Sequence, residues 1–235
     1  MKIVRALKQE ITNIIYEVIS RFSSLKGEVL LDVPYVSQFA RPEHSELSLR
    51  KELDPVADPY WESTGASTPE QYAEWAFTMC GMASTAMAIA YFQSEMILPV
   101  TLAEDALLSD VYTRDEGELS GMRYREFLHW VQKHKLHARM YTKLSVRGIK
   151  YALSHGRLVI ASVNPNIRGY DTAPRNQVGG HLVLVTGYDQ GHLFINNPSG
   201  FTSTDTQIAH RLSDQKFKDF YAGRGIVLSP HKPGK

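Results

Sequence analysis

The stretch CGMASTAMAIAYFQ, residues 80–93, decides the fold of this chain. It is rich in alanine and methionine and carries no charged side chain. The pattern therefore predicts a helix that is buried on most of its sides, not along one stripe. Such a helix needs other elements packed around it, and the neighbouring segments indicate which elements these are.

Helical patterns lie around this stretch, and strands follow them. Thr101 and Glu104 form a capping-box pattern that predicts a short helix, and Ser145 is expected to cap another helix that stops at Gly156. Beyond Gly156 the apolar pattern changes from helical to extended. A further helix is predicted over 122–134, and strands over 158–163, 181–188, 192–196 and 225–228. Because helices come first and strands last, the sequence predicts an α+β fold with segregated layers.

Residues 1–26 are predicted to form one N-terminal amphipathic helix. Apolar side chains recur at three- and four-residue steps and make a single stripe: Val4, Leu7, Ile11, Ile14, Ile15, Val18, Phe22 and Leu25. The simplest expectation is that this helix packs on the main domain. A dimerisation helix and a membrane-surface helix are the alternatives, and the membrane is disfavoured because the polar face mixes both signs of charge.

A long insertion is predicted between the first strand and the buried helix. The sequence LLDVPYVSQ, residues 30–38, predicts a short strand. Residues 39–74 carry prolines and many charges with little periodicity, which is typical of a surface insertion. Trp61 and Trp75 flank this region, and either core packing or a substrate groove would account for them. At the other end, residues 230–235 are expected to be disordered, which leaves a main domain over 27–229.

The composition excludes several classes of protein. The 235 residues are 43% hydrophobic and 22% charged, as in an ordinary globular chain, and the net charge is +1. This balance indicates no nucleic-acid partner. No apolar run approaches the ~20 residues that cross a bilayer, so no integral membrane segment is expected. With one cysteine, Cys80, the chain has no internal disulfide and no multi-thiolate zinc site.

Cys80 is the candidate nucleophile, because it begins the buried helix and a glycine follows it. A helix N-terminus carries about half a positive charge and unpaired N–H groups, and both favour a thiolate. The same N–H groups can stabilise the oxyanion that forms when sulfur attacks a carbonyl. On position alone, however, a cysteine in an alanine-rich helix is more often a small apolar core residue.

His181 is the candidate general base. The sequence GGHLVLVTGYDQGHLFINNP, residues 179–198, predicts a β-hairpin with a three-residue turn over 189–191. Counting back from this turn places residue 181 opposite residue 199 and diagonal to Asn197. The side chains of His181 and Asn197 then emerge on one face, within about 7–8 Å at Cβ. An imidazole that is oriented by an amide and faces a thiolate is the constellation of papain-like acyl transfer.

Four short motifs also give the sequence a family resemblance. In chain order they are VPYVSQ (33–38), CGMAS (80–84), GGHLVLVTGYD (179–189) and INNP (195–198). Together they resemble the C39-like cysteine peptidases, over roughly residues 30–228. The resemblance implies a papain-like fold, in which a helical half with the nucleophile helix packs on an antiparallel sheet that carries the histidine and the asparagine.

The resemblance implies a role for each matching position. Cys80 matches the nucleophile and His181 the general base, while Asn197 matches the residue that orients the histidine. Gln38 matches the side chain that completes the oxyanion hole beside the Cys80 N–H. The chain departs from the family pattern in the insertion between Gln38 and Cys80, in Met82 where proline is common, and in Asn197 where one branch has aspartate.

Other polar residues have simpler explanations. Asp189 is expected to form the hairpin turn, although it is the reserve candidate for orienting His181. Asn196 should point to the opposite face of its strand from Asn197. No metal site and no cofactor are expected, because five- and three-residue steps do not align the remaining candidates on one helical face: His129, His134 and His137.

The sequence thus predicts a thiol-dependent hydrolase that cleaves an amide or peptide bond of a peptide or protein substrate through a Cys80 thioester. Two alternatives stay open. One is a non-catalytic peptide-binding module with the same fold, and the other is an acyltransferase in which an amine replaces water at the same site. A signal peptide is not recognisable, which favours the cytoplasm, whereas the family resemblance leaves export open.

Overall fold

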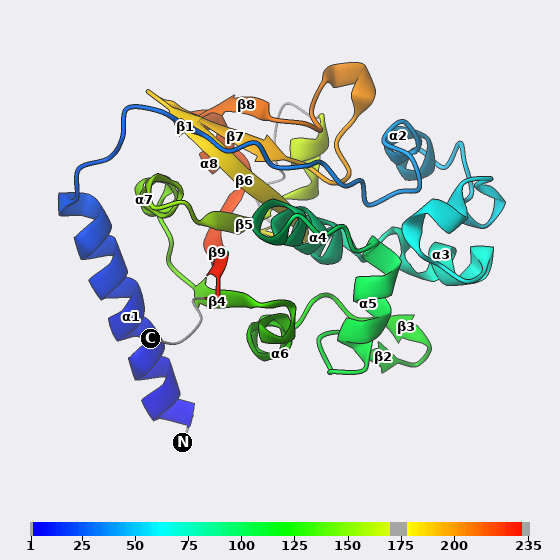
Figure 1. Cartoon of the computed structure of the whole chain (residues 1–235), viewed down its shortest axis with the longest axis horizontal. Helices are drawn as coiled ribbons and strands as arrows, with labels where there is room; N and C mark the ends of the chain where they lie inside the picture. Colours follow the sequence, from blue (N-terminus) through cyan, green and yellow to red (C-terminus); the bar gives the residue numbers. More distant parts are fainter. Residues whose placement is uncertain (1, 170–177, 232–235) are drawn as a thin grey trace.

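An antiparallel sheet forms the middle layer of the molecule (Figure 1). In the computed structural model, which describes residues 2–169 and 178–231, this sheet has seven strands in the order β4-β9-β5-β6-β7-β8, with the short β1 paired to β6. A separate ribbon joins β2 to β3. The strands are β1 (Val29–Leu30), β2 (Arg114–Asp115), β3 (Glu118–Leu119), β4 (Leu136–Tyr141), β5 (Leu158–Val163), β6 (His181–Asp189), β7 (His192–Asn196), β8 (His210–Ser213) and β9 (Tyr221–Pro230).

Helices cover both faces of this sheet (Figure 1). Side chains alternate between the two faces of a strand, so Leu158 and Ile160 of β5 join one apolar core while Val159 and Ala161 join the other. The first core includes residues of α3, α4, α5 and α6, and the second includes residues of α1, α7 and α8. The helices are α1 (Lys2–Phe22), α2 (His44–Leu49), α3 (Pro69–Ala76), α4 (Cys80–Gln93), α5 (Pro99–Leu107), α6 (Tyr124–Trp130), α7 (Val146–Ser154) and α8 (Asp214–Phe220), with 3-10 turns η1 (Pro55–Ala57), η2 (Trp61–Thr64), η3 (Val131–His134), η4 (Pro165–Arg168) and η5 (Thr202–Thr204).

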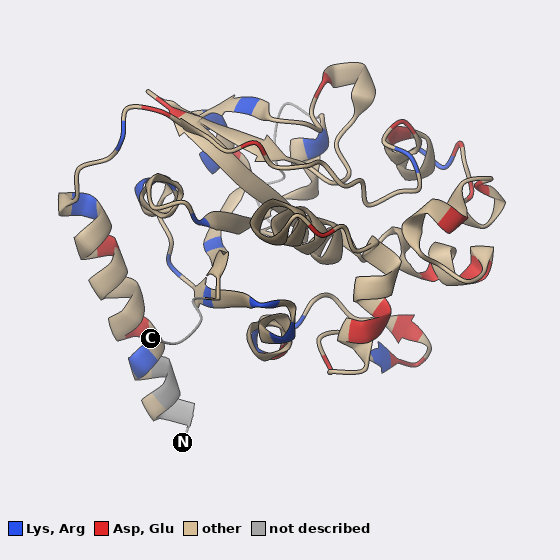
Figure 2. Cartoon of the chain, viewed as in Figure 1, with Lys and Arg blue, Asp and Glu red and all other residues tan. Residues whose placement is uncertain are grey.

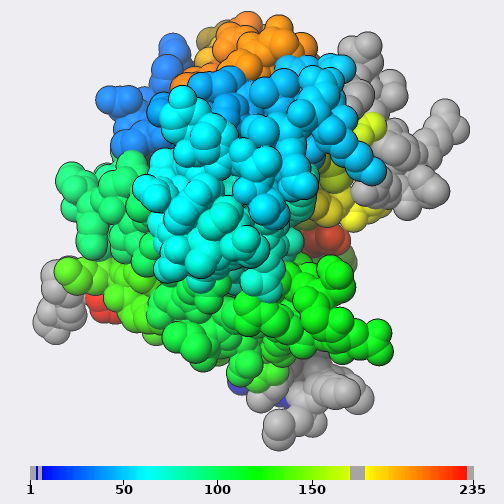
Figure 3. All heavy atoms as spheres, turned by 90° about the vertical axis from the view of Figure 1, so that its right-hand side faces the viewer, coloured from blue at the N-terminus to red at the C-terminus, as the bar shows by residue number. Residues whose placement is uncertain are grey.

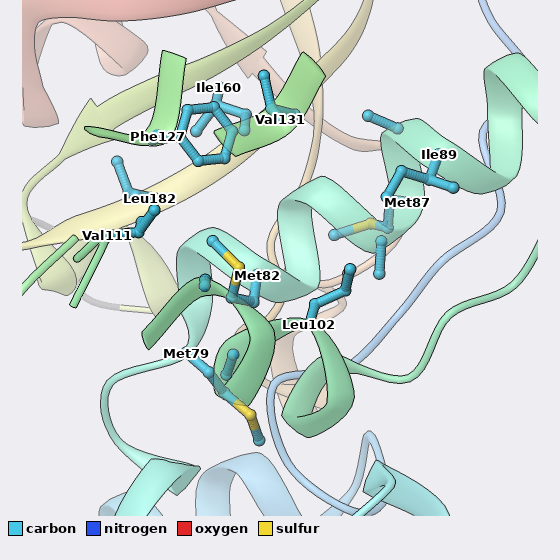
Figure 4. Packing of buried hydrophobic residues seen from close by; sticks show 14 of the residues in the cluster. Met79, Met82, Met87, Ile89, Leu102, Val111, Phe127, Val131, Ile160 and Leu182 are labelled. Atoms are coloured by element: carbon cyan, nitrogen blue, oxygen red, sulfur yellow. The ribbon is translucent and has the colours of Figure 1, made fainter. Parts of the chain in front are cut away.

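Helix α4 is the buried helix that residues 80–93 predict. Every residue from Gly81 to Ala90 is buried. Figure 4 shows Met82, Met87 and Ile89 among side chains contributed by α5, α6 and the sheet. No single helix in the described part of the chain is long and apolar enough to cross a membrane, and α3 and α4 pass that test only when joined across a bend of 97°.

The turn of the β6–β7 hairpin is shorter than the sequence predicts. Asp189 pairs with His192, so the turn consists of Gln190 and Gly191, and the predicted three-residue turn is wrong. Gly191 has φ +101°, a backbone conformation that side chains with a Cβ rarely adopt. The positive φ at the second turn position is one that glycine adopts without strain, so Gly191 can close the two-residue turn.

A bulge in β6 corrects the register of this hairpin. The pairing shifts by one residue between Val185 and Gly187, so that Leu184 lies opposite Asn196. Counting outward from that pair places position 181 opposite position 199, which is the register that the sequence predicts for the open end. The shorter turn and the bulge therefore cancel, and His181 keeps the predicted side of the sheet.

Residues 39–74 are more ordered than an irregular surface segment. They fold into α2, η1, η2 and the start of α3, and their side chains spread over one face of the molecule (Figure 3). Trp75 is fully buried, and its Nε1 donates a hydrogen bond to Glu104 Oε1 at 2.6 Å. Trp61 is partly buried against the same core. Core packing thus accounts for both tryptophans, and neither lines a groove beside Cys80.

Several predicted boundaries are wrong for local reasons. Residues 30–38 form a ladder only at β1, and the rest of that segment runs without strand pairing. Helix α5 begins at Pro99 instead of after Thr101, because proline at the first helical position supplies the helical φ and needs no hydrogen-bond partner for its nitrogen. By contrast, Ser145 Oγ accepts a hydrogen bond from the Gly148 N–H, as expected of the cap of α7.

Helix α1 packs on the domain through its polar face. Asn13 Nδ2 donates to Thr142 Oγ1 at 2.7 Å, and Tyr16 Oη donates to the Gly148 carbonyl at 3.1 Å. The apolar stripe points away from the domain. At the opposite end of the chain, Pro230 closes β9, while residues 232–235 of the predicted disordered tail lie outside the described residues.

Candidate functional site

Cys80 stands at the first position of α4 and is partly buried. Burial raises the pKa of the Cys80 thiol above its usual value of 9.0. The main chain at Leu182, the charge of Arg168 and the main chain at Gly81 and Cys80 itself lower the pKa, but they do not outweigh the desolvation. The start of the helix therefore does not by itself offset the desolvation that disfavours the thiolate of Cys80.

His181 is held by Asn197 at the open end of the hairpin. The imidazole is 1% exposed, and its Nε2 lies 2.8 Å from Asn197 Oδ1. This oxygen also accepts a hydrogen bond from the Ser199 N–H at 3.3 Å. Because an amide oxygen only accepts, Nε2 carries the proton and Nδ1 keeps a lone pair. The structure thus brings together two side chains that are 16 positions apart in the sequence.

Two further residues contact this histidine. Arg168, the last residue of η4, places Nη2 3.4 Å from His181 Nδ1, and its Nε donates to Ser199 Oγ at 2.7 Å. Ser199 Oγ lies 3.3 Å from His181 Nε2. Burial lowers the pKa of His181 well below its usual value, the Arg168 charge lowers it further, and the bond to Asn197 offsets part of this.

Neither Arg168 nor Ser199 is a candidate in the sequence. The sequence could have indicated Ser199, because counting back from the predicted hairpin turn places position 199 opposite His181. No comparable signal exists for Arg168. It lies in a separate segment, and only the folding of η4 beside β6 brings its guanidinium to the ring.

Cys80 and His181 line one pocket of about 280 Å³. In the described part of the chain, no residue of the insertion 39–74 lines it, so the insertion does not form its wall. The wall instead comes from the turn before α4, from the stretch between the end of β3 and the start of α6, and from the start of β6: Phe77, Thr78, Leu119, Gly121, Met122, Tyr124, Gly180 and Leu182.

Gln38 lies buried beside this pocket but does not line it. Its Nε2 donates to the Ala76 carbonyl at 2.8 Å, and its main-chain N–H donates to the Pro198 carbonyl at 2.7 Å. These bonds tie it both to the turn that leads into Cys80 and to the residue that follows Asn197. An amide nitrogen carries two N–H groups, so one remains for a second acceptor.

Comparison with known proteins places this geometry in a family. Residues 30–227 match the Peptidase_C39 like family. The chain belongs to this family. No curated protein matches the chain.

Three solved structures are similar to this C39-like chain. A protein described as a C39-like peptidase from Bacillus anthracis is 17% identical, with 89% of this chain and 100% of that chain covered and a TM-score of 0.53. A double glycine motif protease from an AMS/PCAT transporter, solved in complex with the leader peptide, is 18% identical, with coverages of 66% and 85% and a TM-score of 0.43. The peptidase domain of Streptococcus ComA is 17% identical, with coverages of 65% and 91% and a TM-score of 0.43.

The likeness to the Bacillus anthracis protein, together with the family match, confirms the predicted combination of helices and an antiparallel sheet in a C39 peptidase-like fold. The order of the four sequence motifs thus identified the family correctly.

In this C39-like protein, the two residues ranked below Asn197 for orienting His181 bind other groups. Asp189 lies at the far end of β6 from His181, where its carboxylate contacts His192 Nδ1 at 2.8 Å and Arg211 Nη2 at 2.8 Å. Asn196 points to the other side of β7, with Nδ2 donating to the Val33 carbonyl at 3.2 Å. Among the described residues, no three His, Cys, Asp or Glu side chains form a group that could hold a metal ion.

Proposed function

We propose that this protein is a thiol peptidase that cleaves a peptide bond through a thioester on Cys80. The observation that carries the proposal is the position of His181. The ring is buried, its Nε2 is fixed to Asn197 Oδ1 at 2.8 Å, and it lines the same pocket as Cys80. Core packing alone does not require a cysteine, a histidine and an orienting amide around one pocket.

The proposed reaction starts from two neutral groups. As the Cys80 sulfur attacks the substrate carbonyl, the thiol proton passes to His181 Nδ1, the nitrogen that keeps its lone pair. The peptide C–N bond then breaks, and the amine leaves with that proton. Water attacks the thioester, gives a proton to Nδ1 and releases the acid, and the proton returns to sulfur.

The oxyanion of each tetrahedral intermediate would lie at the start of α4. The Cys80 N–H is one donor, and the second N–H of Gln38 Nε2 is the other. The bond from Gln38 Nε2 to the Ala76 carbonyl fixes the amide without using both of its hydrogens. Asn197 would keep the imidazole in the tautomer that accepts the proton.

The pocket indicates the chemistry of the substrate residue that it takes. Apolar side chains form much of its wall, namely Phe77, Leu119, Met122 and Leu182. A volume of about 280 Å³ suits one side chain or a short segment of extended peptide. We therefore propose a peptide substrate with an apolar residue near the cleaved bond.

Activity against a library of fluorogenic peptides tests this proposal. We expect turnover by the full chain, and its loss in both Cys80→Ala and His181→Ala, since each variant removes one half of the proton transfer. Thermal unfolding of the variants shows whether the fold is kept. Turnover that survives Cys80→Ala would exclude the thioester.

A second candidate, a non-catalytic peptide-binding module, is favoured by one observation. Burial raises the pKa of the Cys80 thiol and lowers that of His181, and both shifts disfavour a resting ion pair. Alkylation by iodoacetamide near pH 6 separates the two candidates. For a peptidase, His181 should assist the alkylation as a base, so the rate should fall in His181→Ala. A binding module should alkylate at the same rate in the parent and in His181→Ala.

A further inference from the structure

The outer side of α1 is a wide apolar surface, which we call the apolar face of α1. It consists of eight large side chains, each 46–80% exposed: Val4, Leu7, Ile11, Ile14, Ile15, Val18, Ile19 and Phe22. At 3.6 residues per turn these side chains spread over an arc of about 140°. Exposed apolar surfaces of this extent are typical of sites that bind a partner or a membrane.

Polar contacts fix the orientation of this helix. On its inner side, Asn13 donates to Thr142, and Glu17 Oε1 accepts a hydrogen bond from the Ser145 N–H at 2.8 Å. Arg147 of α7 donates to two main-chain carbonyls near the end of the helix, those of Ser20 at 2.9 Å and Ser23 at 2.8 Å. A rotation that buried the apolar face would break all of these bonds. The domain therefore presents this face to its surroundings.

The same packing changes the charge of the outer side. The acidic residues Glu10 and Glu17 are directed to the domain, where Glu10 forms an ion pair with Lys143 and Glu17 contacts the cap of α7. Lys8 is exposed within the arc of the apolar face, and Arg21 is exposed at its border. Figure 2 shows the two acidic segments of α1 between a basic segment toward each end. The surface that faces outward is thus apolar and basic, although the helix sequence carries both signs of charge.

We propose that the apolar face of α1 docks on a lipid surface with anionic headgroups, with the helix axis parallel to the surface. Apolar side chains enter the headgroup boundary in this arrangement, and basic side chains contact the headgroups. Lys8 distinguishes this occupant from a second copy of the chain. It lies three residues before Ile11 and seven before Ile15, on the same side of the helix, where a helix pair would bury its charge. At a lipid surface the methylene stem packs among apolar groups while the ammonium reaches water.

Co-sedimentation with vesicles tests the proposal on the full chain. We expect binding to phosphatidylcholine vesicles that contain about a third phosphatidylglycerol, and binding about tenfold weaker to phosphatidylcholine alone or at high salt. The double variant Ile11→Ser/Ile15→Ser should bind about tenfold or more weakly. The matched control, Leu108→Ser/Ile208→Ser, changes two exposed apolar residues elsewhere and should bind like the parent.

The alternatives give different results. Self-association of the lipid-free chain that Ile11→Ser/Ile15→Ser abolishes, without vesicle binding, would overturn the proposal in favour of a dimer. Vesicle binding that the double variant leaves unchanged would overturn it as well, and so would the absence of both binding and association. Because the substituted side chains are exposed, the thermal midpoint of the variant should equal that of the parent, which excludes unfolding as the cause.

Discussion

At the scale of single residues, Asn197 connects the candidate base to the rest of the fold. Its Oδ1 accepts from His181 and from the Ser199 N–H, while its main-chain N–H donates to the Gln207 carbonyl at 2.7 Å. The Tyr35 hydroxyl donates to the Asn197 carbonyl at 3.0 Å. Hydrogen bonds therefore fix the main chain of Asn197 on both sides, and its Oδ1 in turn holds the imidazole of His181.

Substitution of Asn197 should reduce activity without removing the nucleophile. In Asn197→Ala the imidazole loses the acceptor that fixes its tautomer, so we expect kcat/KM to fall by about tenfold to a thousandfold. Asn197→Asp, with an acceptor of the same size, should keep most of the activity and raise the pKa of His181, because a carboxylate favours the imidazolium. Full activity in Asn197→Ala would show that the contact is structural only. The measurement is the pH profile of peptide hydrolysis.

Arg168 should set the pH range of the site. Its charge lowers the pKa of the Cys80 thiol and also that of His181. In Arg168→Gln both pKa values should rise, so the acidic and the alkaline limbs of the kcat/KM profile should move to higher pH together. Arg211→Gln is the control, because Arg211 binds Asp189 at the far end of the hairpin and should leave the profile in place. A profile in Arg168→Gln that does not move would contradict this account.

At the scale of elements, the hairpin shows how a correct register can follow from an incorrect turn. The extended apolar pattern and the position of glycine in the turn predict the two strands, because both features can be read from neighbouring residues in the sequence. The bulge between Val185 and Gly187 has no local signal. It forms where the short strand β1 also pairs with β6, and there the Leu31 N–H donates to the Thr186 carbonyl at 3.0 Å. The register at His181 thus depends on a contact that is distant in sequence.

Gly191 provides a test of the hairpin that leaves the site alone. Its φ of +101° is unfavourable for a residue with a Cβ, so Gly191→Ala should lower the free energy of unfolding by about 1–2 kcal/mol. Nothing lies within 4 Å of the added methyl group, so the loss reports backbone strain and not a clash. Gly27→Ala is the matched control, since that site is equally open and has no positive φ. Urea unfolding measures both variants, and equal stability would refute the assignment of strain.

At the scale of the whole molecule, local patterns predict what each segment is better than where it packs. The apolar stripe of residues 1–26 predicts a helix, but the structure buries its polar side, because Asn13 and Glu17 find partners in the segment between β4 and α7. Strand β4 is missed because it is an edge strand whose exposed positions carry His137 and Arg139. The sequence does not indicate Arg168 as a site residue, because only the tertiary structure brings it beside His181. The candidate residues Cys80, His181 and Asn197 could be found because each is tied to a strong local signal.

The buried ionisable groups of the site also predict how stability depends on pH. Burial and Arg168 hold the pKa of His181 well below 6.5, so below about pH 6.5 the unfolded chain binds a proton that the native state does not. Stability should therefore fall as the pH falls through that range. Above about pH 9 the unfolded thiol loses a proton that buried Cys80 keeps, so stability should fall again as the pH rises. Each such proton changes the free energy of unfolding by about 1.4 kcal/mol per pH unit.

Urea unfolding between about pH 5 and about pH 9.5 separates the contribution of His181 from those of other buried groups. In His181→Asn, the slope of the free energy of unfolding against pH on the acidic side should decrease by up to the contribution of one proton. The reason is that the unfolded variant has no imidazole at this position to protonate. Burial also lowers the pKa of His134 and His210, so some acidic slope should persist in His181→Asn and diminish in His134→Gln. On the alkaline side, Cys80→Ala should reduce the fall above about pH 9, and buried tyrosines such as Tyr35 and Tyr221, whose pKa burial also raises, should account for the slope that persists. An acidic slope that is identical in the parent and in His181→Asn would mean that the imidazole is not desolvated, and the neutral starting state of the proposed reaction would then be wrong.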